Sequence, residues 1–282
     1  MDFFIELLVF IFSIFYTYRF FKKWSQLFSV RSSGDKKLAQ WIFGCLPAIS
    51  FIIILFTLKV LASFDVVNDP FYLIYFIVFG YTCIYFGLNL MAFFFDLSWI
   101  DDVIYLNNKA ALFSITGGFL GLTLIYSCAN IGDGPGWWCV VFAGGLGLIT
   151  WIILGLIINK LTHIFERITV ERDIGCGVRV GLYFIASCII LGRASAGDWT
   201  SFSMTVVEFG DGWPVLPLTA LMIVIELNYI NSAKDQYKTN DNSLAGSLFF
   251  GIAYVLIAII IIILLPSLPE NPIYYSMFAT FI

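Results

Sequence analysis

Apolar runs of about twenty residues recur along nearly the whole chain, and they constrain its fold more than any other feature. About twenty residues of α-helix cross the hydrocarbon core of a bilayer. In lipid every backbone polar group needs an internal partner, which a helix provides. The sequence therefore predicts an all-α polytopic membrane protein with about eight transmembrane helices. The predicted spans are residues 3–20, 41–62, 71–95, 110–130, 137–160, 175–195, 213–230 and 245–266.

The composition excludes most other classes of protein. Hydrophobic residues make up 60% of the chain and charged residues 12%, with a mean hydropathy of +0.93. A soluble globule of this composition would leave much apolar surface in water. The net charge of −4, spread through the loops, argues against nucleic acid as a partner and leaves the lipid bilayer as the surroundings. Asp2 and Glu6 stand where a cleavable signal peptide carries positive charge, so we expect the first span to be retained.

The basic residues predict the orientation in the membrane. If the amino terminus is outside, the inner loops hold thirteen of the fifteen Lys and Arg residues, and only Lys59 and Arg193 lie outside. Because Lys and Arg accumulate on the cytoplasmic side, the sequence predicts that both termini are outside the cytoplasm. Seven of the eight Trp residues fall at predicted water boundaries, Trp151 being the exception, which favours interfacial anchoring over an aromatic ligand cage.

Two connecting segments have features of their own. In residues 96–106, Leu97, Ile100 and Ile104 are near helical spacing with Asp101 and Asp102 opposite, which predicts a short helix on the inner membrane surface. The segment 196–212 is longer than its counterpart 131–136. It is long enough to dip back into the membrane, where protein would have to cover its backbone.

An internal repeat organises the middle of the chain. The stretch 102–132, followed by Asp133, returns 65 positions later as 167–197, followed by Asp198. Each copy has a polar approach, small residues, an apolar run and a Gly-Asp exit. Each repeat comprises two spans, so successive copies enter from the same side and are parallel repeats, not the inverted repeats common in transporters. The identical positions are Phe119 and Phe184, Ile125 and Ile190, Ala129 and Ala194, Gly132 and Gly197, and Asp133 and Asp198.

Small residues recur every three or four positions within the repeat. Such spacing lets helix backbones approach closely, which is the main attraction available between helices in lipid. We therefore expect the spans 110–130, 137–160 and 175–195 to form the tight centre of the bundle; a glycine-lined pore is the alternative. The candidate helix-packing residues are Ala110, Ser114, Gly117, Gly118, Gly121, Gly177 and Gly181.

Two charges fall inside predicted spans at matching depth. Arg179 and Glu226 each lie about four residues from the inner boundary, or roughly 6 Å at the rise of an α-helix. An unpaired charge at that depth is costly, and a guanidinium can satisfy a carboxylate with two parallel hydrogen bonds. The sequence leaves two alternatives open: an intramembrane ion pair, or side chains that reach the head groups separately.

The sequence contains no signature of an enzyme. There is no Gly-rich phosphate loop, no nucleophile with a nearby His base, and no paired carboxylates at mid-bilayer depth. The six cysteines have neither CxxC nor Cys/His ligand spacing, and His163 is the only histidine. We therefore expect no catalytic, cofactor-binding or metal-binding residues, and no cofactor.

The repeat region resembles the YjfL-like family of bacterial inner membrane proteins, whose function is unknown. The resemblance rests on Asn108-Lys-Ala110-Ala-Leu112 leading to Gly117-Gly118-Phe-Leu-Gly121, and on Asp173-Ile-Gly175-Cys-Gly177 leading to Ile190-Leu-Gly192-Arg-Ala194-Ser-Ala196. It departs from the family pattern at Asn107, where a Gly is usual, and at Asp173, where an Asn is usual. The resemblance implies a four-span module, residues 71–197, between extensions 1–70 and 198–282, in a bacterial inner membrane.

Two hypotheses for the function follow. The first is a non-enzymatic inner-membrane module that packs or oligomerises and recruits a partner, either a second copy or another membrane protein. A role in membrane or envelope stress is implied by the resemblance alone. The second is a channel or transporter for an ion or small solute, which normally needs ionisable groups facing a wet cavity.

Overall fold

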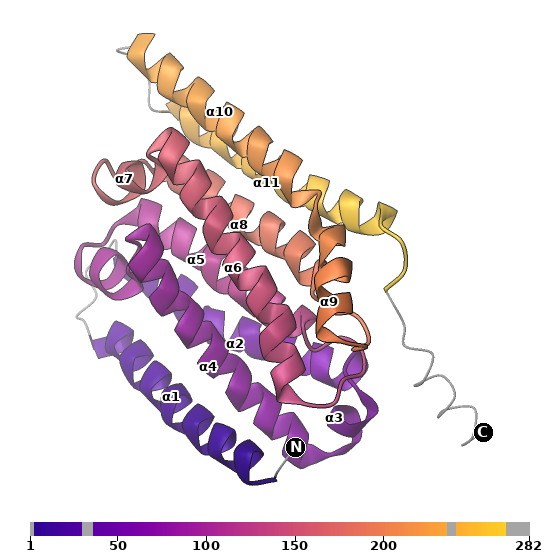
Figure 1. Ribbon diagram of the computed structural model, residues 1–282. Coiled ribbons are helices and arrows are strands. Elements are labelled where there is room, and N and C mark those ends of the chain that lie inside the picture. The colour runs from indigo at the N-terminus through magenta and orange to yellow at the C-terminus, as the bar shows by residue number, and fades with distance from the viewer. Residues whose placement is uncertain (1–2, 30–35, 236–240, 269–282) are drawn as a thin grey trace.

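The computed structural model describes residues 3–29, 36–235 and 241–268, and in these ranges the chain is helical with no β-strand (Figure 1). The last part of the predicted extension 198–282, residues 269–282, lies outside them. The helices are α1 (Phe3–Ser29), α2 (Lys36–Val60), α3 (Phe64–Asn68), α4 (Pro70–Phe95), the π-helix η1 (Trp99–Tyr105), α5 (Lys109–Cys128), α6 (Trp137–Thr162), α7 (Ile164–Thr169), α8 (Ile174–Ala194), α9 (Phe202–Phe209), the 3-10 helix η2 (Gly210–Gly212), α10 (Val215–Asp235) and α11 (Asp241–Leu264).

The prediction of an all-α polytopic membrane protein is confirmed. Seven described helices are long and apolar enough to cross a bilayer, namely α1, α2, α4, α5, α6, α8 and α11. An eighth span forms if α9, η2 and α10 are taken together, and these are bent by 41° at their junction. The segment 196–212 therefore contains the helix α9, in which Thr205 is the only buried residue.

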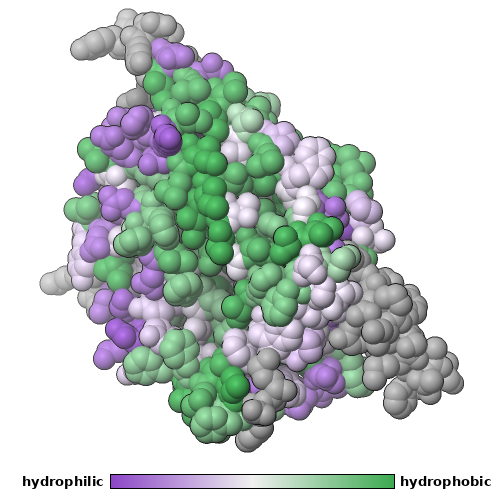
Figure 2. All heavy atoms as spheres, viewed as in Figure 1, coloured by the Kyte–Doolittle hydropathy of each residue, from purple (hydrophilic) through white to green (hydrophobic). Residues whose placement is uncertain are grey.

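Helix α8 is the hub of the bundle. It packs most extensively against α5 and α11, and it also contacts α6 and α10. The earlier helices add a second group, in which α1 packs on α4 and α2 packs on α5. Figure 1 shows α1 and the α10–α11 pair at opposite margins of the bundle. Figure 2 shows apolar residues across the middle of one face, with hydrophilic residues mostly toward its margins, as lipid contact requires.

Helices α5 and α8 approach closely enough for their backbones to touch. A Cβ atom built on Gly117 would lie within 3.0 Å of the Gly181 backbone, and one built on Gly177 would lie equally near the backbone of Ala110. Ser114 strengthens the contact, because its hydroxyl donates to the Gly177 carbonyl at 3.1 Å. We call this contact the α5–α8 seam.

The two helices of the seam run parallel. Gly177, near the start of α8, meets the start of α5, and Gly192, near the end of α8, meets Cys128 at the end of α5. Gly121 belongs to the seam and faces Cys188, whereas Gly118 faces Met91 of α4 and Trp151 of α6. All seven predicted packing residues thus lie against other helices.

Equivalent positions of the proposed repeat have equivalent local roles. Asn108 caps α5 by accepting from the backbone N–H groups of Ala110 and Ala111, and Asp173, 65 residues later, caps α8 by accepting from that of Cys176. Gly132 and Gly197 both have positive φ, at 97° and 134°, a conformation that favours glycine. These correspondences support the repeat, which stays a prediction, as does the division into 1–70, 71–197 and 198–282.

The helix predicted in residues 96–106 forms, but one of its acids points inward. The segment is the π-helix η1, with Leu97 and Ile104 buried as expected. Asp102 was expected on the solvated side and is only 8% exposed. It turns inward because its carboxylate accepts from the backbone N–H of Ser98 at 2.8 Å, so it closes the start of this helix.

Interfacial anchoring is wrong for two of the tryptophans. Trp24 and Trp99 are buried in the bundle with ring centroids 4.8 Å apart, and the Trp24 N–H donates to the Phe43 carbonyl instead of water. Trp41 and Trp213 are exposed, as an interfacial position requires. Trp24 is buried because α1 extends to Ser29, beyond the predicted boundary at residue 20, so this side chain lies on a helix that packs against its neighbours. Trp99 begins η1 and packs on the Trp24 ring.

We predict that Gly117→Ala destabilises the bundle by about 1–3 kcal/mol, because the new methyl group meets backbone that cannot rotate away. Gly145→Ala is the matched control, since a Cβ there has nothing within 4 Å. The control should be neutral or stabilising by up to about 1 kcal/mol through helix propensity. Thermal unfolding in detergent measures both; equal melting of the two variants would contradict the seam.

Candidate functional site

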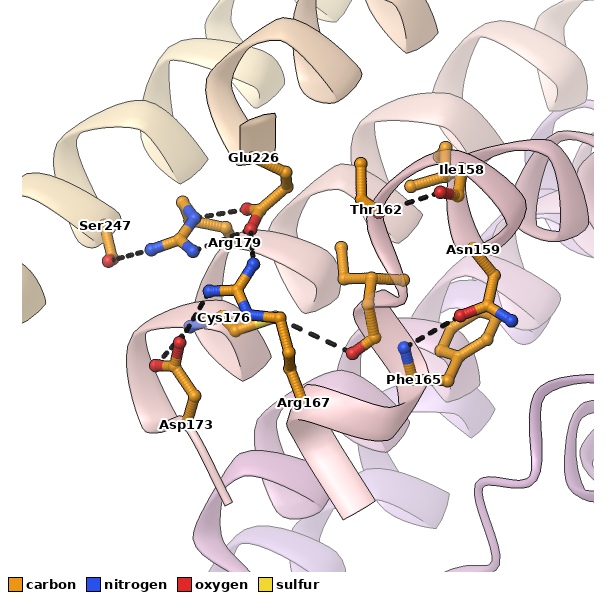
Figure 3. Close-up of polar contacts among 11 residues, drawn as sticks. Ile158, Asn159, Thr162, Phe165, Arg167, Asp173, Cys176, Arg179, Glu226 and Ser247 are labelled. Carbon is orange, nitrogen blue, oxygen red and sulfur yellow. Dashed lines mark hydrogen bonds and ion pairs between the residues drawn. The ribbon is translucent and has the colours of Figure 1, made fainter. Parts of the chain in front are cut away.

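The predicted intramembrane charges meet in the structure. Arg179 of α8 and Glu226 of α10 form a bidentate pair, in which the Arg179 Nε donates to Glu226 Oε1 and its Nη2 donates to Glu226 Oε2 at 2.8 Å (Figure 3). The Arg179 side chain is 1% exposed and that of Glu226 is 0% exposed. The structure thus places the pair inside the protein, and neither side chain reaches the head groups alone.

Two further charges complete the site. Arg167 of α7 donates from Nη1 to Glu226 Oε2 and from Nη2 to Asp173 Oδ2, both at 2.7 Å. Asp173 is also the N-cap of α8, so its carboxylate accepts both from the Cys176 backbone N–H at the start of the helix and from the Arg167 guanidinium. We call Arg167, Asp173, Arg179 and Glu226 the charge cluster. Its two cations and two anions balance.

Neutral groups hold the remaining face of Arg179. Its Nη1 donates to the Ser247 hydroxyl of α11, and its guanidinium carbon lies 3.8 Å from the ring centroid of Tyr229 on α10. A cation over an aromatic face is attracted by the ring quadrupole. Through these contacts, one side chain of α8 joins both α10 and α11 to the centre of the bundle.

The local environment sets the protonation of Asp173, which lies just before α8. Burial by itself raises the pKa of this carboxyl. The hydrogen bond from the Cys176 N–H and the neighbouring Arg167 outweigh burial, so the pKa lies below its ordinary value. The cluster therefore holds an ionised Asp173 at neutral pH.

Sequence reasoning found half of this cluster. It singled out Arg179 and Glu226 by depth, but it assigned Arg167 to an inner loop and Asp173 only to a departure from the family pattern. The sequence did contain a signal for these two residues: Asp173 stands at the cap position before a predicted helix, and Arg167 lies six residues earlier. The contacts of Ser247 and Tyr229 have no local sequence signal, because they depend on how α10 and α11 dock.

A second candidate site is a cavity of about 170 Å³ at the other end of the bundle. We call it the outer cavity, because this end is outside in the predicted orientation. The two Gly-Asp exits of the proposed repeat meet there. The Gly197 N–H donates to the Ile131 carbonyl at 3.1 Å, and the Asp133 N–H donates to the Asp198 carboxylate at 2.7 Å. A further bond of 2.7 Å runs from the Trp199 N–H to the Asp133 carbonyl. These bonds fix the two loops as one wall of the cavity.

Comparisons of the chain with protein-family models, curated proteins and solved structures find no match in any of the three. The resemblance to the YjfL-like family stays a prediction. Within the described ranges, no group of three or more His, Cys, Asp and Glu side chains is arranged to hold a metal ion.

We predict that the two halves of the central pair are not equivalent. Glu226→Leu leaves the buried Arg179 without its carboxylate and should cost about 3–5 kcal/mol of unfolding free energy. Arg179→Leu should cost less, because Glu226 keeps Arg167. The double variant should recover much of the Glu226→Leu loss, since Arg167 still pairs with Asp173. Chemical unfolding of all three variants measures the coupling, and strictly additive losses would contradict it.

We also predict an acid-sensitive contribution from Asp173. Because its folded pKa is below its unfolded value, its stabilising effect is present above about pH 4 and is lost as the pH falls through the lower folded pKa. Asp173→Asn keeps a cap but removes the charge, so this variant should lose stability at neutral pH and lack that part of the acid transition. The exposed carboxylate of Glu171 offers the control Glu171→Gln. Melting temperatures measured down through pH 4 test this, and parallel curves for Asp173→Asn and the wild type would refute it.

Proposed function

We propose that this protein is a non-enzymatic membrane module that acts by assembling with a second copy or with another membrane protein. The observation that carries this proposal is the α5–α8 seam. Helix backbones in contact at Gly117, Gly177 and Gly181 leave no space between them, so these glycines serve packing and do not line a pore there. A rigid centre of this kind suits a scaffold that presents its outer helices to neighbours in the bilayer.

The charge cluster supports the same proposal. Conduction or proton coupling normally uses ionisable groups that face a wet cavity. Here Glu226 accepts from both Arg167 and Arg179, and its side chain is fully buried. The cluster is therefore suited to joining helices α7, α8, α10 and α11, a structural role.

The remaining elements of the proposal come from the sequence. The basic residues support a multi-pass protein with both termini outside the cytoplasm. The resemblance of residues 71–197 to the YjfL-like family supports a bacterial inner membrane and a role in the response to membrane or envelope stress.

A channel or transporter is the second candidate, and one observation favours it. The α9–α10 pair is bent by 41°, and α9 contributes Thr205 and Glu208 to the outer cavity. Discontinuous spans beside a binding cavity are a common arrangement in transporters. Against this candidate, the carboxylate of Glu226 on α10 is buried and already bonded to Arg167 and Arg179, so it does not face a wet cavity.

Two measurements separate these candidates. In nanodiscs made from native membranes, the module should have a protein mass above that of one 31.8 kDa chain. A photo-crosslinker at Phe93, which is 79% exposed, should join it to its neighbour, whereas one at the fully buried Phe119 should not. In proteoliposomes the module should give no ion flux above that of empty vesicles. A monomer that conducts or transports would reject the proposal in favour of the second candidate.

A further inference from the structure

The outer cavity has the size of a binding site for a small molecule. Its walls come from α1, α3, α4, α6, α8 and α9 where these helices reach this end of the bundle, together with the loops that follow α2, α5 and α8. Its volume is about 170 Å³. A dry protein cavity of about 150 Å³ holds benzene, so the space suits a guest of similar size.

The charge of the lining has one sign. Among the described residues, five carboxylates line the cavity and no Lys, Arg or His does; the five are Glu6, Asp65, Asp133, Asp198 and Glu208. The two basic residues at this end are engaged elsewhere, since Lys59 donates to the Val67 carbonyl and Arg193 to the Pro266 carbonyl. Burial, and then the charge of Asp198, raise the pKa of Asp133. A cation entering the cavity would relieve this crowding of negative charge.

Aromatic side chains and unpaired polar groups form the rest of the lining. Tyr72, Tyr75 and Trp137 are among the aromatic residues that line the cavity. Tyr75 is only 3% exposed, and its hydroxyl has no hydrogen-bond partner among the described residues. The indole N–H of Trp137 is likewise without a partner there. A buried polar group without a partner is costly, and a ligand that bonds to it removes that cost.

The chemistry of the lining selects between kinds of cation. No three or more of these carboxylates are grouped to hold a metal ion in the part of the chain that the structure describes. Aromatic faces beside carboxylates instead suit alkylammonium groups, which bind through cation–π attraction and charge. We propose that the outer cavity binds a small organic ammonium compound, with Asp133 and Tyr75 among its contacts. The same group occurs in free amines and in ethanolamine or choline lipid head groups.

The test measures binding to the intact protein in nanodiscs of anionic lipid that lack ammonium head groups. The probe is choline, and the control ligand is its neutral isostere, 3,3-dimethylbutan-1-ol. Choline should bind and the isostere should not. Asp133→Asn should weaken choline binding roughly ten- to a hundredfold, and Tyr75→Phe, which keeps the ring, roughly three- to tenfold. Asp211→Asn removes a charge that interacts with Glu208 of the lining but does not itself line the cavity, so it should leave binding unchanged.

A second arm identifies the source of the ammonium group. Nanodiscs that contain phosphatidylethanolamine should compete with choline if the natural ligand is a head group, and should not if it is a free amine. Equal binding of choline and its isostere, binding of inorganic cations alone, or full choline affinity in folded Asp133→Asn would overturn the proposal. Melting curves establish that each variant is folded. The experiment reads binding and not assembly, so it can fail independently of the proposed function.

Discussion

Backbone contact between α5 and α8 is the interaction on which the rest of the bundle depends. Lipid tails are as apolar as the side chains of these helices, so burial of apolar surface does little to hold helices together in a membrane. Close approach of the helix backbones provides the attraction instead, and it requires small residues where the helices touch. Gly117, Gly177 and Gly181 provide this, and the Ser114 hydroxyl adds a hydrogen bond across the same contact. The other long helices then pack around a centre that cannot easily be displaced.

The charge cluster solves a different problem, which is how α10 and α11 join that centre. Neither helix shares a glycine seam with α8 like that of α5, although α11 packs along it closely at Gly251. Arg179 reaches Glu226 on one helix and Ser247 on the other, and Arg167 ties the same carboxylate to the cap of α8. In a low dielectric these bonds are strong when complete and costly when broken. The cluster therefore specifies one docking arrangement of the two last helices.

The two ends of the α5–α8 pair differ in chemistry. At the end that holds the charge cluster, the carboxylates of Asp173 and Glu226 and the arginines neutralise one another within a few ångströms. At the other end, the loops that follow α5 and α8 bond to each other and leave carboxylates around the outer cavity, which no basic residue lines within the described ranges. The charges of one end thus satisfy one another, whereas at the other end Tyr75 and Trp137 have polar groups without a partner among the residues that the structure describes. That contrast is why ligand binding is proposed at the outer end alone.

The sequence by itself determined the class, the approximate spans and the small residues that pack, because lipid imposes length and polarity on every crossing segment. It also brought Arg179 and Glu226 to the same depth, since rise per residue fixes depth. Only the tertiary structure decided which neighbours those charges meet. Arg167 from α7, Asp173 from the start of α8 and Ser247 from α11 join them, and helix rotation, which local sequence does not fix, selects those contacts. Helix packing also decided that Trp24 and Trp99 are buried, and a bond from the Ser98 N–H holds Asp102 inward. The cavity could not be predicted because its walls come from segments far apart in the chain.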